Sequence, residues 1–161
     1  MEQLRSKKGF ICDMDGVIYH GNRLLPGVKE FVEWLYKEDK KFLFLTNSSD
    51  RSPRDLQQKL QRMGLDIDET HFYTSAQATA RFLNSQSPGC SAYVMGEAGL
   101  MNALYEVGIT MNDSTPDYVV IGEPKSYNYE MIIKAVKLIQ NGAKLVATNS
   151  DLTGPTENGI I

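Results

Sequence analysis

The stretch FICDMDGV at residues 10–17 decides the fold of this chain. An apolar run of strand character ends there in two carboxylates at positions i and i+2, followed by a glycine. If the strand continues through both, Asp13 and Asp15 point to the same side of it. Two anions roughly 6 Å apart repel by about 3 kcal/mol at an effective dielectric constant of about 20. A bound cation or a held proton relieves this repulsion, so the pair favours a metal-assisted reaction.

Two other interpretations of this stretch stay open. An acidic turn that follows a buried strand has the same composition. A calcium loop fits less well, because that pattern places a third oxygen ligand where Val17 stands.

Composition excludes several classes of function. The chain has 161 residues with 17 basic and 20 acidic side chains, so no charge footprint for a nucleic acid polymer is present. No apolar run approaches the length of a membrane span, and no signal peptide precedes the first strand. Cys12 and Cys90 lack metal-ligand spacing. We therefore expect a cytoplasmic protein without a membrane partner.

Strands and helices alternate along the chain, which predicts an α/β fold with parallel sheets and right-handed crossovers. Ser75 is the predicted cap of the third helix, and the loop at 84–91 is a candidate linker. The predicted strands end at 13 and lie at 42–45, 72–73, 92–95, 118–121 and 145–147, with helices near 28–35, 53–63, 75–82, 100–107 and 127–139.

Polar side chains follow the first two strands. Asp13 and Asp15 leave the first strand, and Thr46 and Asn47 leave the second. Ligands of parallel sheets collect at this carboxyl edge. Carboxylates hold a hard divalent cation, while a hydroxyl and a carboxamide donate to phosphate oxygens. The set predicts phosphoryl transfer through an aspartyl phosphate, whereas Thr46 and Asn47 alone are also ordinary turn residues.

These motifs resemble those of a known family. DMDGV at 13–17 and LTN at 45–47 look like the first and second motifs of haloacid dehalogenase superfamily phosphatases. Further stretches are similar to the NagD-like ribonucleotide monophosphatases, namely YTSA at 73–76, VMGE at 94–97, VIGEPKSYNY at 120–129 and ATNSD at 147–151.

The resemblance implies a fold and a set of roles. Residues 1–74 would form the first half of a Rossmann-like catalytic core, and residues 75–161 an inserted but incomplete α/β cap. Asp13 would be the nucleophile and a Mg²⁺ ligand, and Asp15 would be the acid/base, with its backbone carbonyl as a second Mg²⁺ ligand. Thr46 and Asn47 would bind the phosphoryl group. The implied substrate is a small phosphorylated metabolite, such as UMP or GMP.

The chain departs from the family pattern in one respect. The third motif's lysine and the fourth motif's acidic cluster are not found, and Asp151, a conceivable substitute ligand, matches a cap position. The candidate lysines lie in cap-like surroundings (Lys125, Lys134, Lys137 and Lys144). We expect a chain truncated before the rest of its core, inactive and poorly stable alone, or completed by a homo-oligomer or a partner chain.

Two other functions compete with the phosphatase. A receiver-like signalling domain also forms an aspartyl phosphate, but it carries its acceptor on a middle strand, away from its acidic pair. A catalytically incomplete fragment would act only in binding or assembly. His20 and His71 are expected to be surface and structural residues, and Trp34 to be partly buried.

Overall fold

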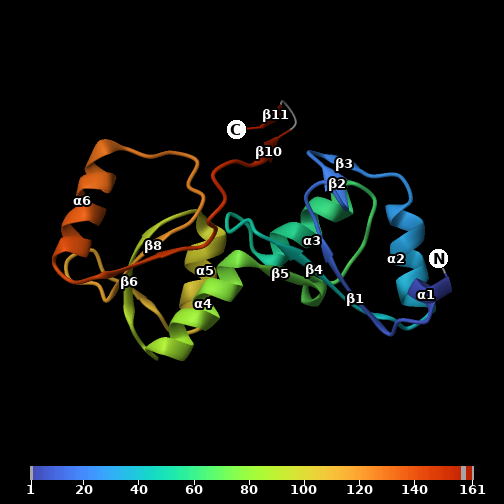
Figure 1. The fold of residues 1–161 in the computed structure, drawn as a ribbon, viewed down its shortest axis with the longest axis horizontal. Coiled ribbons are helices and arrows are strands. Elements are labelled where there is room, and N and C mark those ends of the chain that lie inside the picture. The colour runs from blue at the N-terminus through green and yellow to red at the C-terminus, as the bar shows by residue number, and fades with distance from the viewer. Residues whose placement is uncertain (1, 157–158, 161) are drawn as a thin grey trace. The chain divides into compact units, whose positions relative to one another are not determined.

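The computed structural model describes residues 2–156 and 159–160, which form two compact units (Figure 1). Unit 1 comprises the described residues within 1–46, 53–73 and 151–161, and unit 2 comprises 47–52 and 74–150. The predicted division after residue 74 differs from these units at Thr74, which groups with unit 2, and in two segments. Residues 47–52 group with unit 2, and the residues from 151 onward group with unit 1. The assignment of the two parts to core and cap stays a prediction.

Unit 1 is built on a three-stranded sheet in the order β1-β4-β5. Its strands are β1 (Gly9–Asp13), β4 (Lys41–Thr46) and β5 (Phe72–Thr74). β1 and β4 run parallel, as predicted, with Gly9 opposite Lys41 and Asp13 opposite Leu45. The sheet order leaves β1 at an edge.

Two helices of unit 1 contribute buried residues to its core. α2 (Val28–Lys37) begins after Gly27, whose φ of 84° is in the left-handed region, and α3 (Pro53–Arg62) begins at the predicted proline. The core residues with no exposed surface include Phe44 of β4 and Leu60 of α3. The whole buried cluster contains Met14, Ile18, Tyr19, Val28, Val32, Leu35, Phe42, Phe44, Leu56, Leu60, Leu65, Ile67 and Phe72.

The two faces of the unit 1 sheet differ in burial. Phe42, Phe44 and Thr46 of β4 are buried, whereas Leu43 and Leu45 between them are only half-buried. Ile11, which is paired with Leu43 across the parallel strands, is 72% exposed. An apolar side chain exposed to this extent does not contribute the stabilisation that its burial would give. The prediction of a strand covered on both faces is therefore only half right.

Unit 2 contains a four-stranded sheet in the order β7-β6-β8-β9, in which every neighbouring pair is parallel. The strands are β6 (Ser91–Met95), β7 (Thr110–Met111), β8 (Tyr118–Ile121) and β9 (Lys144–Ala147). The helices are α4 (Ser75–Gln86), α5 (Ala98–Glu106) and α6 (Tyr129–Gln140).

Helices cover both faces of the unit 2 sheet (Figure 1). Val120 of β8 packs in one cluster with α4 and α5 residues such as Leu83 and Leu100. The preceding residue of β8, Val119, packs in a second cluster with Leu138 of α6. Successive strand residues point to opposite faces, so β8 has an entirely buried apolar run from Tyr118 to Val120. Unit 2 is thus a three-layer α/β arrangement, and its sheet is parallel, as the alternation of elements predicted.

The start and end of α4 differ from the prediction. Thr74 is the N-cap, not Ser75, because the Thr74 hydroxyl accepts from the Gln77 N–H and the Gln77 side chain accepts from the Thr74 N–H. This reciprocal capping box requires Gln three residues after the cap, which only Thr74 satisfies. The helix then runs to Gln86, so the predicted linker at 84–91 starts inside it.

Several short elements were not predicted. The antiparallel hairpin of β2 and β3 lies close after the acidic stretch, with Tyr19 opposite Leu24. The complete set is α1 (Glu2–Arg5), β2 (Tyr19–His20), β3 (Arg23–Leu24), η1 (Glu69–His71), β7, β10 (Pro155–Thr156) and β11 (Gly159–Ile160). No helix within the described part of the chain is long and apolar enough to cross a membrane.

Candidate active site

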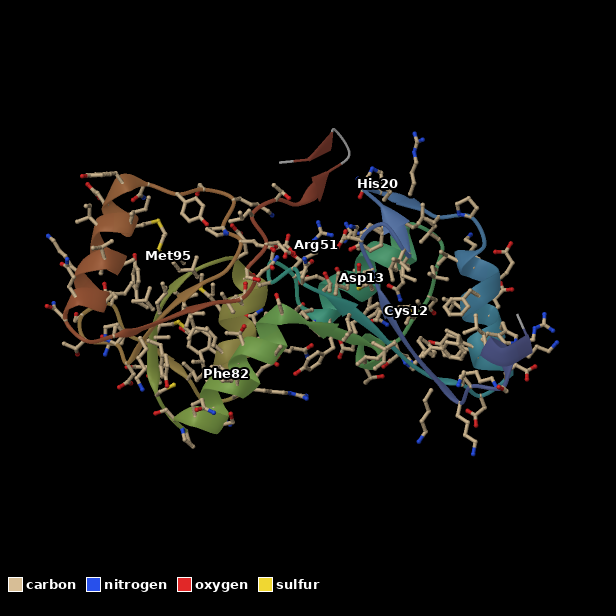
Figure 2. All side chains as sticks on the ribbon, in the orientation of Figure 1. Cys12, Asp13, His20, Arg51, Phe82 and Met95 are labelled. Carbon is tan, nitrogen blue, oxygen red and sulfur yellow. The ribbon has the colours of Figure 1, made fainter. Side chains whose placement is uncertain are left out.

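The carboxyl edge of the unit 1 sheet holds three of the four predicted site residues. β1 ends at Asp13, which is exposed, and β4 ends at Thr46, which is buried. Asp13 is opposite Leu45 in the parallel register, so Thr46 lies one residue further along the neighbouring strand. Figure 2 shows Asp13 and its neighbour Cys12 on β1. The register therefore places a carboxylate and a hydroxyl at the same edge.

A tight turn carries Asp15 away from the strand. Met14 is fully buried, and its carbonyl accepts from the N–H groups of Val17 and Ile18 at 3.2 and 2.8 Å. Gly16 has a φ of 77° and donates its N–H to the Tyr19 carbonyl at 2.8 Å. A side chain at position 16 would strain this left-handed conformation. The buried Met14 and the hydrogen-bonded turn fix the backbone on both sides of Asp15.

The condition for a same-side acidic pair, a strand that continues through both residues, is not met. The strand stops at Asp13, so the alternation of strand side chains does not describe Asp15. Asp15 is half-buried and forms an isolated bridge with Tyr19 in the turn. The turn, and not a continued strand, determines the position of the second carboxylate.

Asn47 is the fourth predicted residue and belongs to the other unit. It is exposed and follows Thr46 directly, but the segment that it begins groups with unit 2. The covalent chain thus passes from unit 1 to unit 2 between two adjacent candidate phosphate-binding residues. The roles of Asp13, Asp15, Thr46 and Asn47 stay predictions.

Neither cysteine has the lowered pKa of a reactive thiol. Burial raises the pKa of Cys12 and of Cys90 above the usual thiol value, which keeps both thiols protonated at neutral pH. Cys12 is half-buried and packs against the core of unit 1, and Cys90 is buried in the core of unit 2. Their role is structural packing.

The histidines behave as expected. The His71 ring stacks on Phe42 with centroids 3.8 Å apart, and its Nδ1 lies 3.0 Å from the Phe42 carbonyl oxygen, which confirms a structural role. His20 is exposed at the end of β2 (Figure 2). Trp34 is partly buried against the core, beside Phe10.

The described residues contain no group of three or more Asp, Glu, His or Cys side chains that could hold a metal ion. Of the candidate lysines, Lys134 forms an ion pair with Asp113 at 2.6 Å, and the hydrogen bond from Lys134 lowers the pKa of the Asp113 carboxyl group. Asp151, considered as a substitute ligand, is exposed. A cation at the unit 1 edge therefore has Asp13 and Asp15 as its candidate ligands.

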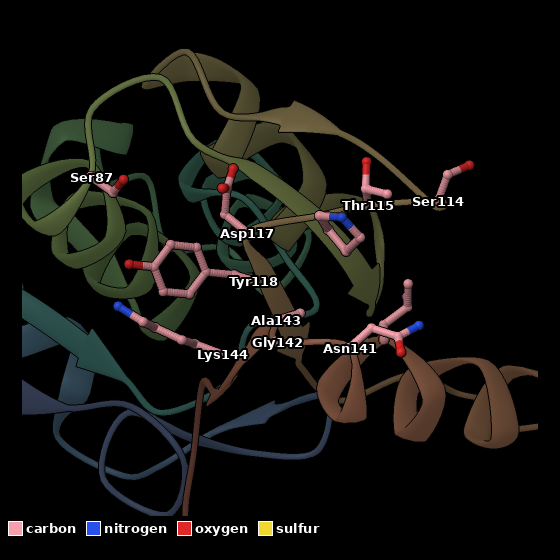
Figure 3. A pocket seen from close by; sticks show the side chains of 11 residues that line it. Ser87, Ser114, Thr115, Asp117, Tyr118, Asn141, Gly142, Ala143 and Lys144 are labelled. Carbon is pink, nitrogen blue, oxygen red and sulfur yellow. The ribbon is translucent and has the colours of Figure 1, made fainter.

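A separate cavity of about 400 Å³ lies in unit 2, at the amino ends of β8 and β9 (Figure 3). Asp117, Tyr118 and Lys144 line it together with the end of α6. The Asp117 carboxylate accepts from the Ser91 N–H and hydroxyl at 2.7 and 2.8 Å. No predicted site residue lines this cavity, which lies at the opposite end of the strands from the edge where parallel sheets bind ligands.

Sequence reasoning missed one polar network, at the carboxyl edge of the unit 2 sheet. Ser48 lies 2.9 Å from Glu123, and Asn149 donates to Glu123 at 3.4 Å. The Gly96-Glu97 and Gly122-Glu123 pairs, each of which follows a strand, were noted only for the resemblance. Their repetition after neighbouring strands was the signal that acidic side chains gather at this edge.

Comparison with known proteins agrees with this arrangement. The haloacid dehalogenase-like hydrolase family matches residues 10–110. A dihydroxyacetone phosphatase of Corynebacterium glutamicum is 43% identical over 152 residues, which are 94% of this chain and 55% of that protein. The ribonucleotide monophosphatase NagD of Escherichia coli is 42% identical over 147 residues, covering 91% of this chain and 58% of NagD.

Solved structures give the same result. NagD from Escherichia coli superposes with a TM-score of 0.86 at 40% identity, over 95% of this chain and 61% of that one. A glycerol phosphate phosphatase from Mycobacterium tuberculosis in complex with magnesium has a TM-score of 0.88 at 28% identity, over 96% of this chain and 47% of that one.

This chain belongs to the haloacid dehalogenase-like hydrolase family. Within that family it is similar to the NagD-type phosphatases. It spans 55% and 58% of the length of the two curated relatives named above.

Proposed function

We propose that this chain carries the nucleophile and the first phosphate-binding residues of a magnesium-dependent phosphatase that hydrolyses small phosphomonoesters. The observation that supports the proposal most is the register of β1 and β4, which brings Asp13 and Thr46 to one edge of a parallel sheet. Parallel sheets bind their ligands at this edge. The fixed turn after Asp13 then supplies a second carboxylate, that of Asp15.

The proposed reaction has two steps. An Asp13 carboxylate oxygen forms a bond to phosphorus while the ester P–O bond breaks, and Asp15 gives its proton to the leaving alcohol oxygen. Water then attacks phosphorus and gives a proton to Asp15, and the bond between phosphorus and Asp13 breaks to release inorganic phosphate. Splitting the hydrolysis through a covalent intermediate lowers each barrier. Thr46 and Asn47 bind the phosphoryl oxygens.

The candidate ligands fit Mg²⁺. The Asp13 carboxylate and the Asp15 backbone carbonyl are oxygen donors, which Mg²⁺ prefers, and water and substrate phosphate would complete its coordination. When bound, the cation offsets the negative charge of the phosphate so that an anionic nucleophile can approach it. The glycerol phosphate phosphatase that this chain resembles was solved with magnesium.

The proposed substrates are one group among the phosphomonoesters for which similar proteins are named. The similar proteins are named for dihydroxyacetone phosphate, ribonucleotides and glycerol phosphate. These compounds share a phosphomonoester and differ in the leaving group. We propose nucleoside monophosphates such as UMP or GMP for this chain, because its stretches at 94–97 and 120–129 resemble those of the NagD-like ribonucleotide monophosphatases and NagD is 42% identical to it.

A second candidate function is binding or assembly without catalysis. It is favoured by the edge position of β1 and by the 72% exposure of Ile11, which leave the strand that carries Asp13 open to a further chain segment. A homo-oligomer or a partner chain could supply that segment. An assay of phosphate release distinguishes binding alone from catalysis.

The test is magnesium-dependent release of phosphate from UMP by the complete product of the reading frame. Asp13→Asn should reduce the rate by at least about 1,000-fold, because an amide cannot act as the nucleophile. Asp39→Asn is the matched control: Asp39 has a φ of 48°, which Asn tolerates, and the substitution should leave the rate unchanged. Persistent hydrolysis by Asp13→Asn would reject the proposal, and an inactive wild type would favour the binding function.

A further inference from the structure

The segment 47–52 is anchored on the carboxyl edge of the unit 2 sheet, although it follows the last strand residue of β4 directly. Ser48 begins the set of contacts. Its Oγ lies 2.9 Å from a Glu123 carboxylate oxygen and 2.9 Å from an Asp50 carboxylate oxygen. Since the hydroxyl has one proton, it donates to one carboxylate at a time. Of these two carboxylates, Asp50 belongs to the segment itself, whereas Glu123 lies outside it and ties the segment to unit 2.

Ser49 extends the contact to a second strand end. Its side chain is completely buried, and the Thr148 hydroxyl donates to its Oγ at 3.1 Å. A buried hydroxyl without a partner costs about 1–3 kcal/mol, so this hydrogen bond matters for the placement of the segment. Glu123 follows β8 and Thr148 follows β9, so two adjacent strands hold two adjacent residues of the segment.

Two glycines are required by the close approach of the same segment. A Cβ on Gly99 would lie 2.6 Å from the Arg51 backbone nitrogen and carbonyl carbon, and a Cβ on Gly122 would lie 2.8 Å from the Ser49 Oγ. The Gly99 N–H, in the first turn of α5, donates to the Asp50 carbonyl at 3.2 Å. A helix leaves its first N–H groups without intrahelical partners, and the segment satisfies this one. The sheet edge is thus shaped to receive the backbone of residues 49–51.

We infer that Glu123 is a positioning residue for the phosphate-binding turn, because it holds the 47–52 segment on unit 2 and thereby orients the Asn47 carboxamide. This inference rests on the proposed function for the role of Asn47. The contacts that anchor the segment do not rest on it. Glu123 acts through Ser48, whose Oγ it contacts.

The first experiment needs no enzyme assay. It measures how firmly the segment is held on α5, from the hydrogen-exchange rate of the Gly99 amide in this chain. Glu123→Ala should accelerate this exchange about 10-fold, since the Asp50 carbonyl is no longer held against α5. Glu123→Gln should keep the slow exchange of the wild type, because the glutamine amide oxygen still accepts from the Ser48 hydroxyl. Glu97→Ala is the matched control: Glu97 follows the neighbouring strand and accepts from the Lys125 N–H. Amides of β8 should keep their exchange rates in all three variants.

The second experiment measures KM and kcat for UMP and for p-nitrophenyl phosphate in the complete product of the reading frame. Glu123→Ala should raise KM about fivefold to tenfold for both substrates, with kcat within about twofold. The two substrates share only the phosphoryl group, so equal changes locate the effect at that group. A variant that is merely unstable lowers the apparent kcat and leaves KM unchanged.

The outcomes separate the two proposals. Unaltered Gly99 exchange in Glu123→Ala, or an unaltered KM, would overturn the positioning role. Unequal KM changes would also overturn it, because they would mean that Glu123 recognises the leaving group. A wild type that hydrolyses neither substrate contradicts the proposed function and the role of Asn47, while the exchange measurement still decides whether Glu123 holds the segment.

Discussion

Single residues of this chain are constrained by close backbone approach as well as by chemistry. Gly99 does not have a positive φ, yet any side chain there would meet the Arg51 backbone. Gly16 is the opposite case, with open space around it and a φ of 77°. The same residue type is thus required by packing at one position and by conformation at the other.

Gly99→Ala should destabilise unit 2 by roughly 1–3 kcal/mol, because backbone atoms cannot yield to the new Cβ as a flexible side chain would. Urea unfolding measures this change. Gly154→Ala is the control, since a Cβ there has nothing within 4 Å and no positive φ opposes it. Equal stability of the two variants would show that the 47–52 segment is not packed tightly on α5.

Among the secondary-structure elements, α4 has the best-defined start. The capping box of Thr74 and Gln77 satisfies two backbone N–H groups. Thr74→Ala removes the accepting hydroxyl and should lower the free energy of unfolding by about 1 kcal/mol. Ser85→Ala, near the other end of the same helix, removes an exposed hydroxyl and should change stability by less than about 0.5 kcal/mol. Thermal or urea unfolding compares the two variants, and a larger loss in Ser85→Ala would contradict the capping role.

The amino ends of β6 and β8 are joined by Asp117. Hydrogen bonds from the Ser91 N–H and hydroxyl lower the pKa of the Asp117 carboxyl group below its usual value. A carboxyl group whose pKa is lower in the folded state stabilises the fold above its unfolded pKa, and this stabilisation is lost as pH falls through the folded pKa.

Asp117→Asn should therefore reduce the free energy of unfolding at pH 7 but have a smaller effect near pH 3. Urea unfolding at both pH values measures the difference. Glu106→Gln, at the exposed end of α5, is the control and should show little effect at either pH. An Asp117→Asn effect that grows at low pH would have the wrong sign.

At the scale of the whole molecule, the sequence was sufficient for the alternation of strands and helices and for the parallel sheets. The apolar runs at 42–45 and 118–121 predicted β4 and β8 within a residue or so at each end, because a short continuous apolar run is typical of a strand in a parallel sheet. Two-residue strands such as β7 carry too few residues for a period to be visible.

The candidate site was predicted less completely. Asp13 and Thr46 could be placed at the sheet edge from the sequence because each ends a recognisable strand. The position of Asp15 depends on the hydrogen-bonded turn around Met14 and Gly16, which the i, i+2 spacing does not encode. The contact of Ser48 with Glu123 joins residues 75 positions apart, so no local pattern could have indicated it.

The central claim, that Asp13 is the nucleophile, is tested most directly by trapping its phosphorylated form. Asp15→Asn should still react with p-nitrophenyl phosphate, whose leaving group needs no proton, but should not activate water for the second step. We predict a burst of p-nitrophenol equal to the enzyme present and a phosphoryl group, located by mass spectrometry, on the peptide that contains Asp13. A phosphoryl group on any other residue, or the same burst from the Asp13→Asn, Asp15→Asn double variant, would contradict the account.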